Sequence, residues 1–165
     1  MHGQRLLYLY QREYFWNNGN GNMSIIIKAA SLDDIAEILK IENACFSSPW
    51  SEGSISDALN NPCSRFYLAF ADGKTAGYMG VQIFSGEGYV TNIATLPEFR
   101  RHGVAKALIN KALENEMDFI TLEVRESNIP AIELYNSFGF VEVGKRPNYY
   151  SNPTENAILM TKELK

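Results

Sequence analysis

The feature that most constrains the fold of this chain is a short basic loop between a strand-like run and an amphipathic helix. Residues 88–95 form the strand-like run, the basic loop 100–103 ends in glycine, and the apolar positions from Val104 onward keep a helical period. A further strand is predicted over 119–124. Because a helix connects it to the strand at 88–95, these two strands are expected to pair in parallel. The first turn of the helix would present unpaired N–H groups and a positive dipole end to an anion such as a phosphate.

The rest of the sequence predicts an α/β (α+β) domain with a mixed sheet. Ser31, with an acidic residue three positions on, predicts a helix start, and residues 72–74 predict a hairpin turn. Pro130 and Gly139 suit the two ends of another helix. Helices are predicted over 35–46, over 54–60, from 103 onward and over 130–138, and strands over 25–29, 65–71, 75–84, 88–95, 119–124, 140–144 and 157–162.

Composition limits the class of protein. The 165 residues suffice for one domain with a full hydrophobic core and are too few for two domains that each have one. A formal net charge of -4 argues against a general nucleic-acid binder. Cys45 and Cys63 lack the spacing of a zinc site or a disulfide framework, so we expect no metal, and free thiols in a reducing cytoplasm. No apolar run approaches the roughly 20 residues of a membrane span, so no membrane partner is expected.

The first 22 residues differ in composition from the rest of the chain. Residues 17–22 consist of asparagine and glycine alone, which is typical of a linker. We therefore expect residues 1–22 to be an appendage or leader and residues 23–165 to be the folded domain. Met23 is the expected natural start.

Several motifs carry a resemblance to a known family. The loop 100–105 fits the pattern Arg/Gln-x-x-Gly-x-Gly/Ala after a strand, and it resembles the acyl-coenzyme A pyrophosphate loop of the GNAT acetyltransferases, with Ala105 in place of the last glycine. The order of predicted elements over 24–164 is that of the GNAT fold, which implies a mixed central sheet of about six to seven strands flanked by about four helices. Four short motifs resemble those of the ribosomal-protein-alanine N-acetyltransferase (RimI-type) subgroup. They lie at 46–51, 92–94, 122–128 and 148–150.

Glu123 is the candidate catalytic base. On the predicted strand Leu122 and Val124 point to one face and Glu123 to the other. Because a central parallel strand is normally covered on both faces, a carboxylate there must be paired or must look into a cleft. Pairing with Arg125, or a solvated position near the strand end, is the alternative reading. The resemblance implies that Glu123 is the family's proton acceptor.

The resemblance also implies a catalytic acid and an acetyl-CoA site. Tyr135 would lie beside the thioester sulfur and protonate the departing thiolate; the alternative is an aromatic ring packed on the sheet with its hydroxyl at the surface, and both can hold at once. Asn128 would contact the cofactor, or cap a helix, or do both. The other cofactor residues are expected to act mainly through backbone groups: the strand end would pair with pantetheine as a further strand would, and the basic loop would hold the pyrophosphate. The alternative for the loop is a solvated loop with a helix cap. These residues are Ile93, Ala94, Thr95, Arg101, His102, Gly103, Val104, Ala105 and Lys106.

The expected function is acetylation of a protein N-terminal α-amine by direct transfer from acetyl-CoA, because neither cysteine lies on the predicted cofactor strand ends. The resemblance points to the N-terminal alanine of a small-subunit ribosomal protein. Trp50, Tyr149 and Tyr150 would line the peptide site, although such aromatics are as often packing anchors. Two alternatives stay open at this stage: a GNAT enzyme acting on lysine or a small amine, and a non-catalytic acyl-CoA-binding or partner-binding module. Retention of both Glu123 and Tyr135 counts against the module.

Overall fold

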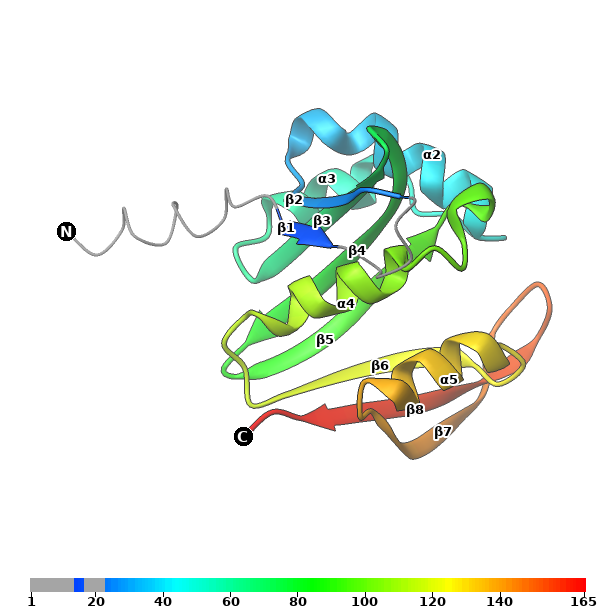
Figure 1. Cartoon of the computed structure of the whole chain (residues 1–165). Helices are drawn as coiled ribbons and strands as arrows, with labels where there is room; N and C mark the ends of the chain where they lie inside the picture. The colour runs from blue at the N-terminus through cyan, green and yellow to red at the C-terminus, as the bar shows by residue number, and fades with distance from the viewer. Residues whose placement is uncertain (1–13, 17–22) are drawn as a thin grey trace. The chain divides into compact units, whose positions relative to one another are not determined.

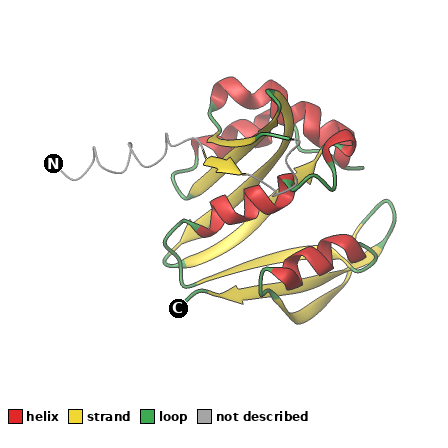
Figure 2. Cartoon of the chain, in the orientation of Figure 1, coloured by secondary structure: helices red, strands yellow, loops and turns green. Residues whose placement is uncertain are grey.

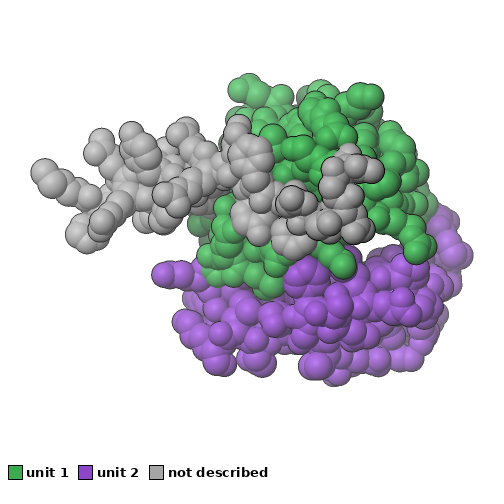
Figure 3. All heavy atoms as spheres, in the orientation of Figure 1, with its two compact units in different colours: residues 1–81, 92–115 green, residues 82–91, 116–165 purple. Residues whose placement is uncertain are grey.

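The computed structural model describes residues 14–16 and 23–165, and its helices and strands are shown in Figure 1 and Figure 2. The chain divides into two compact units, which we describe separately (Figure 3). The first unit comprises Met1–Val81 and Asn92–Asn115, and the second comprises Gln82–Thr91 and Glu116–Lys165. No helix in the described part of the chain is long and apolar enough to cross a membrane.

The first unit contains strands in the order β1-β2-β3-β4-β5 together with three helices. Strand β2 pairs antiparallel with both β1 and β3. Helix α4 contacts β2 and β3, whereas α3 contacts β3 and α2. The bounds are β1 (Tyr14–Trp16), β2 (Ile25–Ala29), β3 (Ser64–Ala71), β4 (Lys74–Phe84), β5 (Glu87–Thr95), α2 (Ile35–Cys45), α3 (Glu52–Asn60) and α4 (Val104–Leu113), with short 3-10 turns at Leu32–Asp34 and Pro97–Phe99.

The core of the first unit forms where the helical stripes meet the sheet. Ile38 and Ile41 of α2 and Ile55 of α3 are fully buried against strand residues that include Leu68 and Tyr78. The predicted helix start holds, since the backbone N–H and the hydroxyl of Ser31 both donate to the Asp34 carboxylate. Burial of these branched side chains, at about 25 cal/mol per Å², is the main force that joins the helices to the sheet.

The second unit is built on the strand order β5-β6-β8-β7, with one helix. Strand β6 (Phe119–Arg125) pairs in parallel with β5 over Glu87–Tyr89, as predicted, and antiparallel with β8 (Glu155–Glu163). Strand β7 (Val141–Tyr150) pairs antiparallel with β8. Helix α5 (Ile129–Ser137) follows β6 and lies along these strands in Figure 2. Counting β2 to β8 and α2 to α5, the described residues give seven strands and four helices, in agreement with the expected fold.

Two predictions about element bounds are corrected. Strand β7 extends to Tyr150 and not to 144, because its pairing with β8 absorbs extra residues through register shifts near Gly144 and between Arg146 and Tyr150. In addition, the sequence predicted no strand before residue 25, whereas Tyr14–Trp16 pairs with Ile25–Ile27 of β2. That residues 1–22 are an appendage or leader stays a prediction. Residues 1–13 and 17–22 lie outside the described part of the chain.

Candidate active site

Glu123 lies on β6 with its carboxylate almost fully buried. The strand alternates as predicted, with Leu122 and Val124 buried on one face and Glu123 on the other. Only 7% of the Glu123 side chain is exposed, and the Nε atom of Arg146 lies 3.0 Å from its Oε1 atom in an ion pair. The hydroxyl of Tyr89 donates to the other oxygen, Oε2. Both carboxylate oxygens are therefore held by residues of the same unit.

The alternative reading of Glu123 is wrong on both counts. Arg125 pairs with Glu155, at 3.2 Å, and not with Glu123. The Glu123 carboxylate is also not solvated, since its side chain is buried. Each carboxylate oxygen has two lone pairs, so the bonds from Tyr89 and Arg146 leave acceptor capacity for a further N–H or O–H group.

Tyr89 and Arg146 differ in how firmly they are fixed. Burial, followed by its hydrogen bond to the Glu123 carboxylate, raises the pKa of Tyr89, so the phenol remains a donor. Arg146 is half-exposed at 55%, and its guanidinium lies 5.6 Å from the centre of the Tyr149 ring. The carboxylate thus has one half-buried neutral donor and one cationic partner that faces solvent.

Tyr149 and Tyr150 form an aromatic wall at the end of β7. Their rings meet edge to face at 5.1 Å. The guanidinium of Arg125 lies 4.4 Å from the Tyr150 ring and donates to the backbone oxygens of Ser151 and Pro153. Burial, with a smaller effect of the nearby Glu123 charge, raises the pKa of Tyr150 to about 12. The predicted peptide-site tyrosines therefore lie beside the predicted base.

Tyr135 is buried on helix α5, with 6% of the residue exposed. Its ring packs against Phe140 at 5.8 Å, and the residue is not at the surface. Burial raises the pKa of Tyr135, so the phenol keeps its proton at neutral pH. No described residue forms a hydrogen bond with this hydroxyl. Tyr135 thus offers a proton donor that is not already engaged within the described chain.

Asn128 begins helix α5. Its side-chain oxygen accepts from the backbone N–H of Ala131 at 3.3 Å, so the predicted capping role is confirmed. The side chain remains exposed, and the cap uses one of its polar atoms. Its predicted contact with the cofactor stays a prediction.

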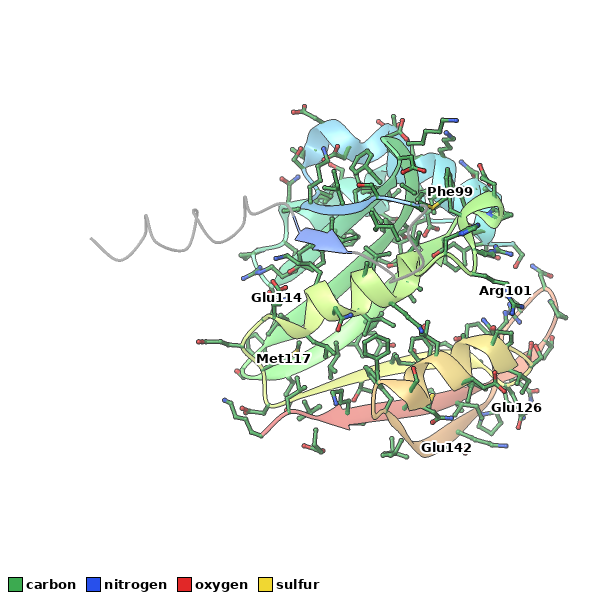
Figure 4. All side chains as sticks on the ribbon, viewed as in Figure 1. Phe99, Arg101, Glu114, Met117, Glu126 and Glu142 are labelled. Carbon is green, nitrogen blue, oxygen red and sulfur yellow. The ribbon has the colours of Figure 1, made fainter. Side chains whose placement is uncertain are left out.

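The basic loop of the first unit leads into α4 with a left-handed turn. Gly103 has a φ of +93° and Arg101 has a φ of +66°, a conformation that glycine adopts without strain. No side chain caps the first turn of α4, so its N–H groups point outward at the helix N-terminus. Arg101, His102 and Lys106 are exposed here, Ala105 is half-buried and Val104 is buried (Figure 4 labels Arg101). Anion binding at this turn stays a prediction.

Residues 93–95, which are predicted to pair with pantetheine, lie at the end of β5. Ala94 is buried, whereas Ile93 and Thr95 are half-buried. The carbonyl oxygen of Thr95 accepts from Arg100 Nε at 3.1 Å and from Cys45 Sγ at 3.5 Å. These contacts fix the strand end next to the basic loop, within the first unit.

Gly77 on β4 allows a close approach of this strand end. A β-carbon at position 77 would lie 2.5 Å from the carbonyl oxygen of Ala94 and 3.1 Å from Cγ1 of Val104. We expect Gly77→Ala to lower the free energy of unfolding by about 1–3 kcal/mol, because backbone cannot move aside as a side chain can. Chemical denaturation measures this. Gly53→Ala is the matched control, since the nearest atom to its new methyl group is 3.9 Å away; equal losses in both variants would contradict the steric argument.

Trp50 also belongs to the first unit. Its side chain is half-buried and packs against the core cluster of Ile38, Ile41 and Ile55. Its backbone N–H donates to the buried carboxylate of Glu42 at 2.7 Å. The candidate residues therefore form two groups: Glu123, Asn128, Tyr135, Tyr149 and Tyr150 in the second unit, and Trp50, 93–95 and 101–106 in the first.

Sequence reasoning missed Glu42, Tyr89 and Arg146. A signal for Glu42 existed, because it falls on the apolar stripe of α2 beside Ile38 and Ile41, where a charged residue is unusual. Tyr89 and Arg146 gave no local signal, since they lie far from Glu123 in the sequence. Among the described residues, no three His, Cys, Asp or Glu side chains gather in a way that could hold a metal ion.

Comparisons with known proteins place this chain in a family. Residues 35–140 match the model of the acetyltransferase (GNAT) family. A Bacillus subtilis (strain 168) protein, named provisionally as a ribosomal protein bS18-alanine N-acetyltransferase, is 37% identical over 139 residues, which cover 81% of this chain and 92% of that protein. The ribosomal protein bS18-alanine N-acetyltransferase of Escherichia coli (strain K12) is 32% identical over 140 residues, covering 81% and 94%.

A solved structure agrees with these sequence matches. The crystal structure of the ribosomal-protein-S18-alanine N-acetyltransferase from Escherichia coli aligns with a TM-score of 0.80 and 29% identity, covering 86% of this chain and 94% of that one. The resemblance drawn from the basic loop and the four local motifs is confirmed. The chain belongs to the acetyltransferase (GNAT) family and is an N-acetyltransferase.

Proposed function

We propose that this enzyme transfers an acetyl group from acetyl-CoA to the N-terminal α-amine of a protein, and that its acceptor is the N-terminal alanine of a small-subunit ribosomal protein. The observation that carries the proposal is the 37% identity over 139 residues to a relative named for this reaction. The buried carboxylate beside two tyrosines in the second unit supports it chemically. Because ribosomal proteins are made in the cytoplasm and Cys45 and Cys63 are free thiols, we infer action in the cytoplasm.

An α-amine suits the base that the enzyme offers. Its pKa is about 7.7 to 8.0, against about 10.4 for lysine, so deprotonation at pH 7 costs only about 1 kcal/mol. Glu123 would accept that proton, directly or through one water, at the lone pairs that Tyr89 and Arg146 leave available. A strong base is therefore unnecessary for this acceptor.

Acetyl-CoA supplies the thioester, whose C–S bond breaks as the amine nitrogen bonds to the carbonyl carbon. Tyr135 would give its phenol proton to the thiolate that leaves, and burial keeps that proton in place until it is needed. Neither free cysteine lies among the proposed catalytic residues, so direct transfer is the simplest sequence of events.

The first unit fits acetyl-CoA by the chemistry of its groups. The uncapped first turn of α4 and the exposed Arg101 and Lys106 would hold the pyrophosphate. The described pairing of β5 with β6 ends at Tyr89, so the backbone of Ile93, Ala94 and Thr95 would be available for the amides of pantetheine. His102, Gly103, Val104 and Ala105 would contribute the loop backbone.

The aromatic wall would bind the acceptor peptide. Replacing Tyr149 and Tyr150 together by alanine should raise the peptide KM at least about tenfold, because each ring offers a large apolar contact to the peptide. The KM for acetyl-CoA should change less than about twofold. Steady-state kinetics with each substrate varied in turn measures both constants. Phe84→Ala, which removes an aromatic ring that is 71% exposed, is the control and should change neither.

The proposal is tested by thiol release from acetyl-CoA across a panel of acceptors. An alanine-first ribosomal peptide should turn over, and its N-terminally blocked version should not. Turnover with lysine or small amines alone would keep the enzyme class and overturn the acceptor. Tight acetyl-CoA binding without any turnover would favour the non-catalytic binding module.

A further inference from the structure

A second buried carboxylate, on Glu42, lies in the first unit and has no part in the chemistry above. Glu42 is 1% exposed near the end of α2. None of the ion pairs found among the described residues includes it. A buried carboxylate without a cation depends on its hydrogen bonds, and removal of a bond to such a group is costly.

Three donors from three segments converge on this carboxylate. The Trp50 N–H donates to Oε2 at 2.7 Å, the Asn92 side-chain amide donates to Oε1 at 3.3 Å, and the Tyr78 hydroxyl also donates to Oε1. Burial, with the charge of Glu42 next in size, raises the pKa of Tyr78, so its hydroxyl stays protonated. One side chain thus joins strand β4, strand β5 and the loop after α2.

The loop 46–51 is held by hydrogen bonds at Phe46, Trp50 and Ser51. At its start, the Phe46 N–H donates to the backbone oxygen of Glu42 at 3.0 Å. At its end, the Ser51 hydroxyl accepts from the Ser54 N–H and caps α3. Between these points, the Glu42 carboxylate holds Trp50. Without that bond the loop between these two points would depend on packing of the Phe46 and Trp50 rings against the core.

Asn92 extends the same network towards the strand end that would bind acetyl-CoA. It directly precedes Ile93, and its amide nitrogen must face Glu42, because an oxygen there would oppose the carboxylate. Its own oxygen is buried without a partner among the described residues. Glu42 therefore fixes the Asn92 side chain as well as the loop.

We propose that Glu42 is a positioning residue for acceptor recognition. Its carboxylate sets the place of Trp50 and the loop 46–51 against β5, so that the loop can contact the acceptor peptide. The inference rests on the proposed function, since it requires a peptide acceptor. It assigns no role in proton transfer to Glu42.

The test is Glu42→Gln, which keeps the shape of the side chain but turns one accepting oxygen into a donor. The peptide KM should rise about tenfold, while the KM for acetyl-CoA stays within about twofold. Tyr78→Phe removes one donor and keeps the Trp50 bond, so its peptide KM should rise about threefold. Tyr67→Phe is the matched control: it removes a buried hydroxyl in the same unit, bonded to Asn115, and should leave the peptide KM unchanged.

A readout without turnover separates this inference from the proposed function. In a Trp16→Phe background, Trp50 is the only tryptophan of the chain, and its fluorescence should be quenched more strongly by acrylamide in Glu42→Gln. Unchanged quenching, or an unchanged peptide KM in a cooperatively folded variant, overturns the inference. So does an equal rise of the peptide KM in Tyr67→Phe. Failure of the wild-type enzyme to acetylate peptides would instead overturn the proposed function.

Discussion

Glu123→Gln is expected to lower kcat about 100-fold or more, with little change in the KM for acetyl-CoA. General base catalysis contributes about 10² to 10⁴ in rate, and the amide cannot accept the proton of the amine. Glutamine keeps the size of the side chain, and its oxygen can still accept from Tyr89 or Arg146, so the fold should persist. Steady-state kinetics with the alanine-first peptide measures the loss.

The control for Glu123→Gln lies three residues along the chain. Glu126 is 41% exposed, pairs with Lys145 and accepts from Asn156 (Figure 4 labels Glu126). Glu126→Gln removes a carboxylate of the same unit and should leave kcat within about twofold, because exposed ion pairs contribute little. A similar loss in both variants would show that Glu123 acts through general electrostatics and not as the base.

Tyr135→Phe is expected to lower kcat about 10- to 100-fold, because the thiolate would then leave without a positioned proton. The substitution deletes one oxygen and keeps the ring that packs against Phe140. The free energy of unfolding should therefore change by less than about 1 kcal/mol, since no described residue bonds to the hydroxyl.

The pH profile gives a second check on Tyr135. Burial raises the pKa of its phenol, so loss of the proton cannot limit the rate at ordinary assay pH. Ionisation of Tyr135 should therefore cause no fall in the kcat of the wild-type enzyme between pH 7 and about 9.5. The shape of the profile in this range should be the same in Tyr135→Phe. If such a basic limb were found and then lost in the variant, a phenol with a lowered pKa would be acting, and the assignment of Tyr135 as the acid would fail.

Local signals sufficed for much of the fold. The helix start at Ser31, the hairpin at 72–74 and the crossover from β5 through α4 to β6 each depend on residues close together in sequence, and each holds in the structure. The predicted strand at 140–144 is shorter than β7 because Pro147 and Asn148 are turn formers. The structure accommodates them in register shifts, with Asn148 at a φ of +52°, and continues the strand.

The site was predicted less completely than the fold, for a related reason. Alternation on β6 identified Glu123 as a side chain that needs a partner, but it could not say which. Arg125 was the near candidate, whereas the partners are Tyr89 and Arg146, which tertiary pairing brings in from β5 and β7. Spacing in the sequence indicates on which face of a strand a side chain lies. The partners of that side chain depend on which strands pair with one another.

The position of Arg125 has a consequence for how acceptor preference can vary. Glu123 and Arg125 are two residues apart on β6 and so share a face, about 7 Å from each other. One carries the expected base, and the other fixes Tyr150 and the turn at Ser151 and Pro153. Arg125 thus holds the aromatic wall from the same strand that carries the expected base. We therefore expect substitutions at the tip of the β7–β8 hairpin, residues 151–154, to change the acceptor preference without moving Glu123.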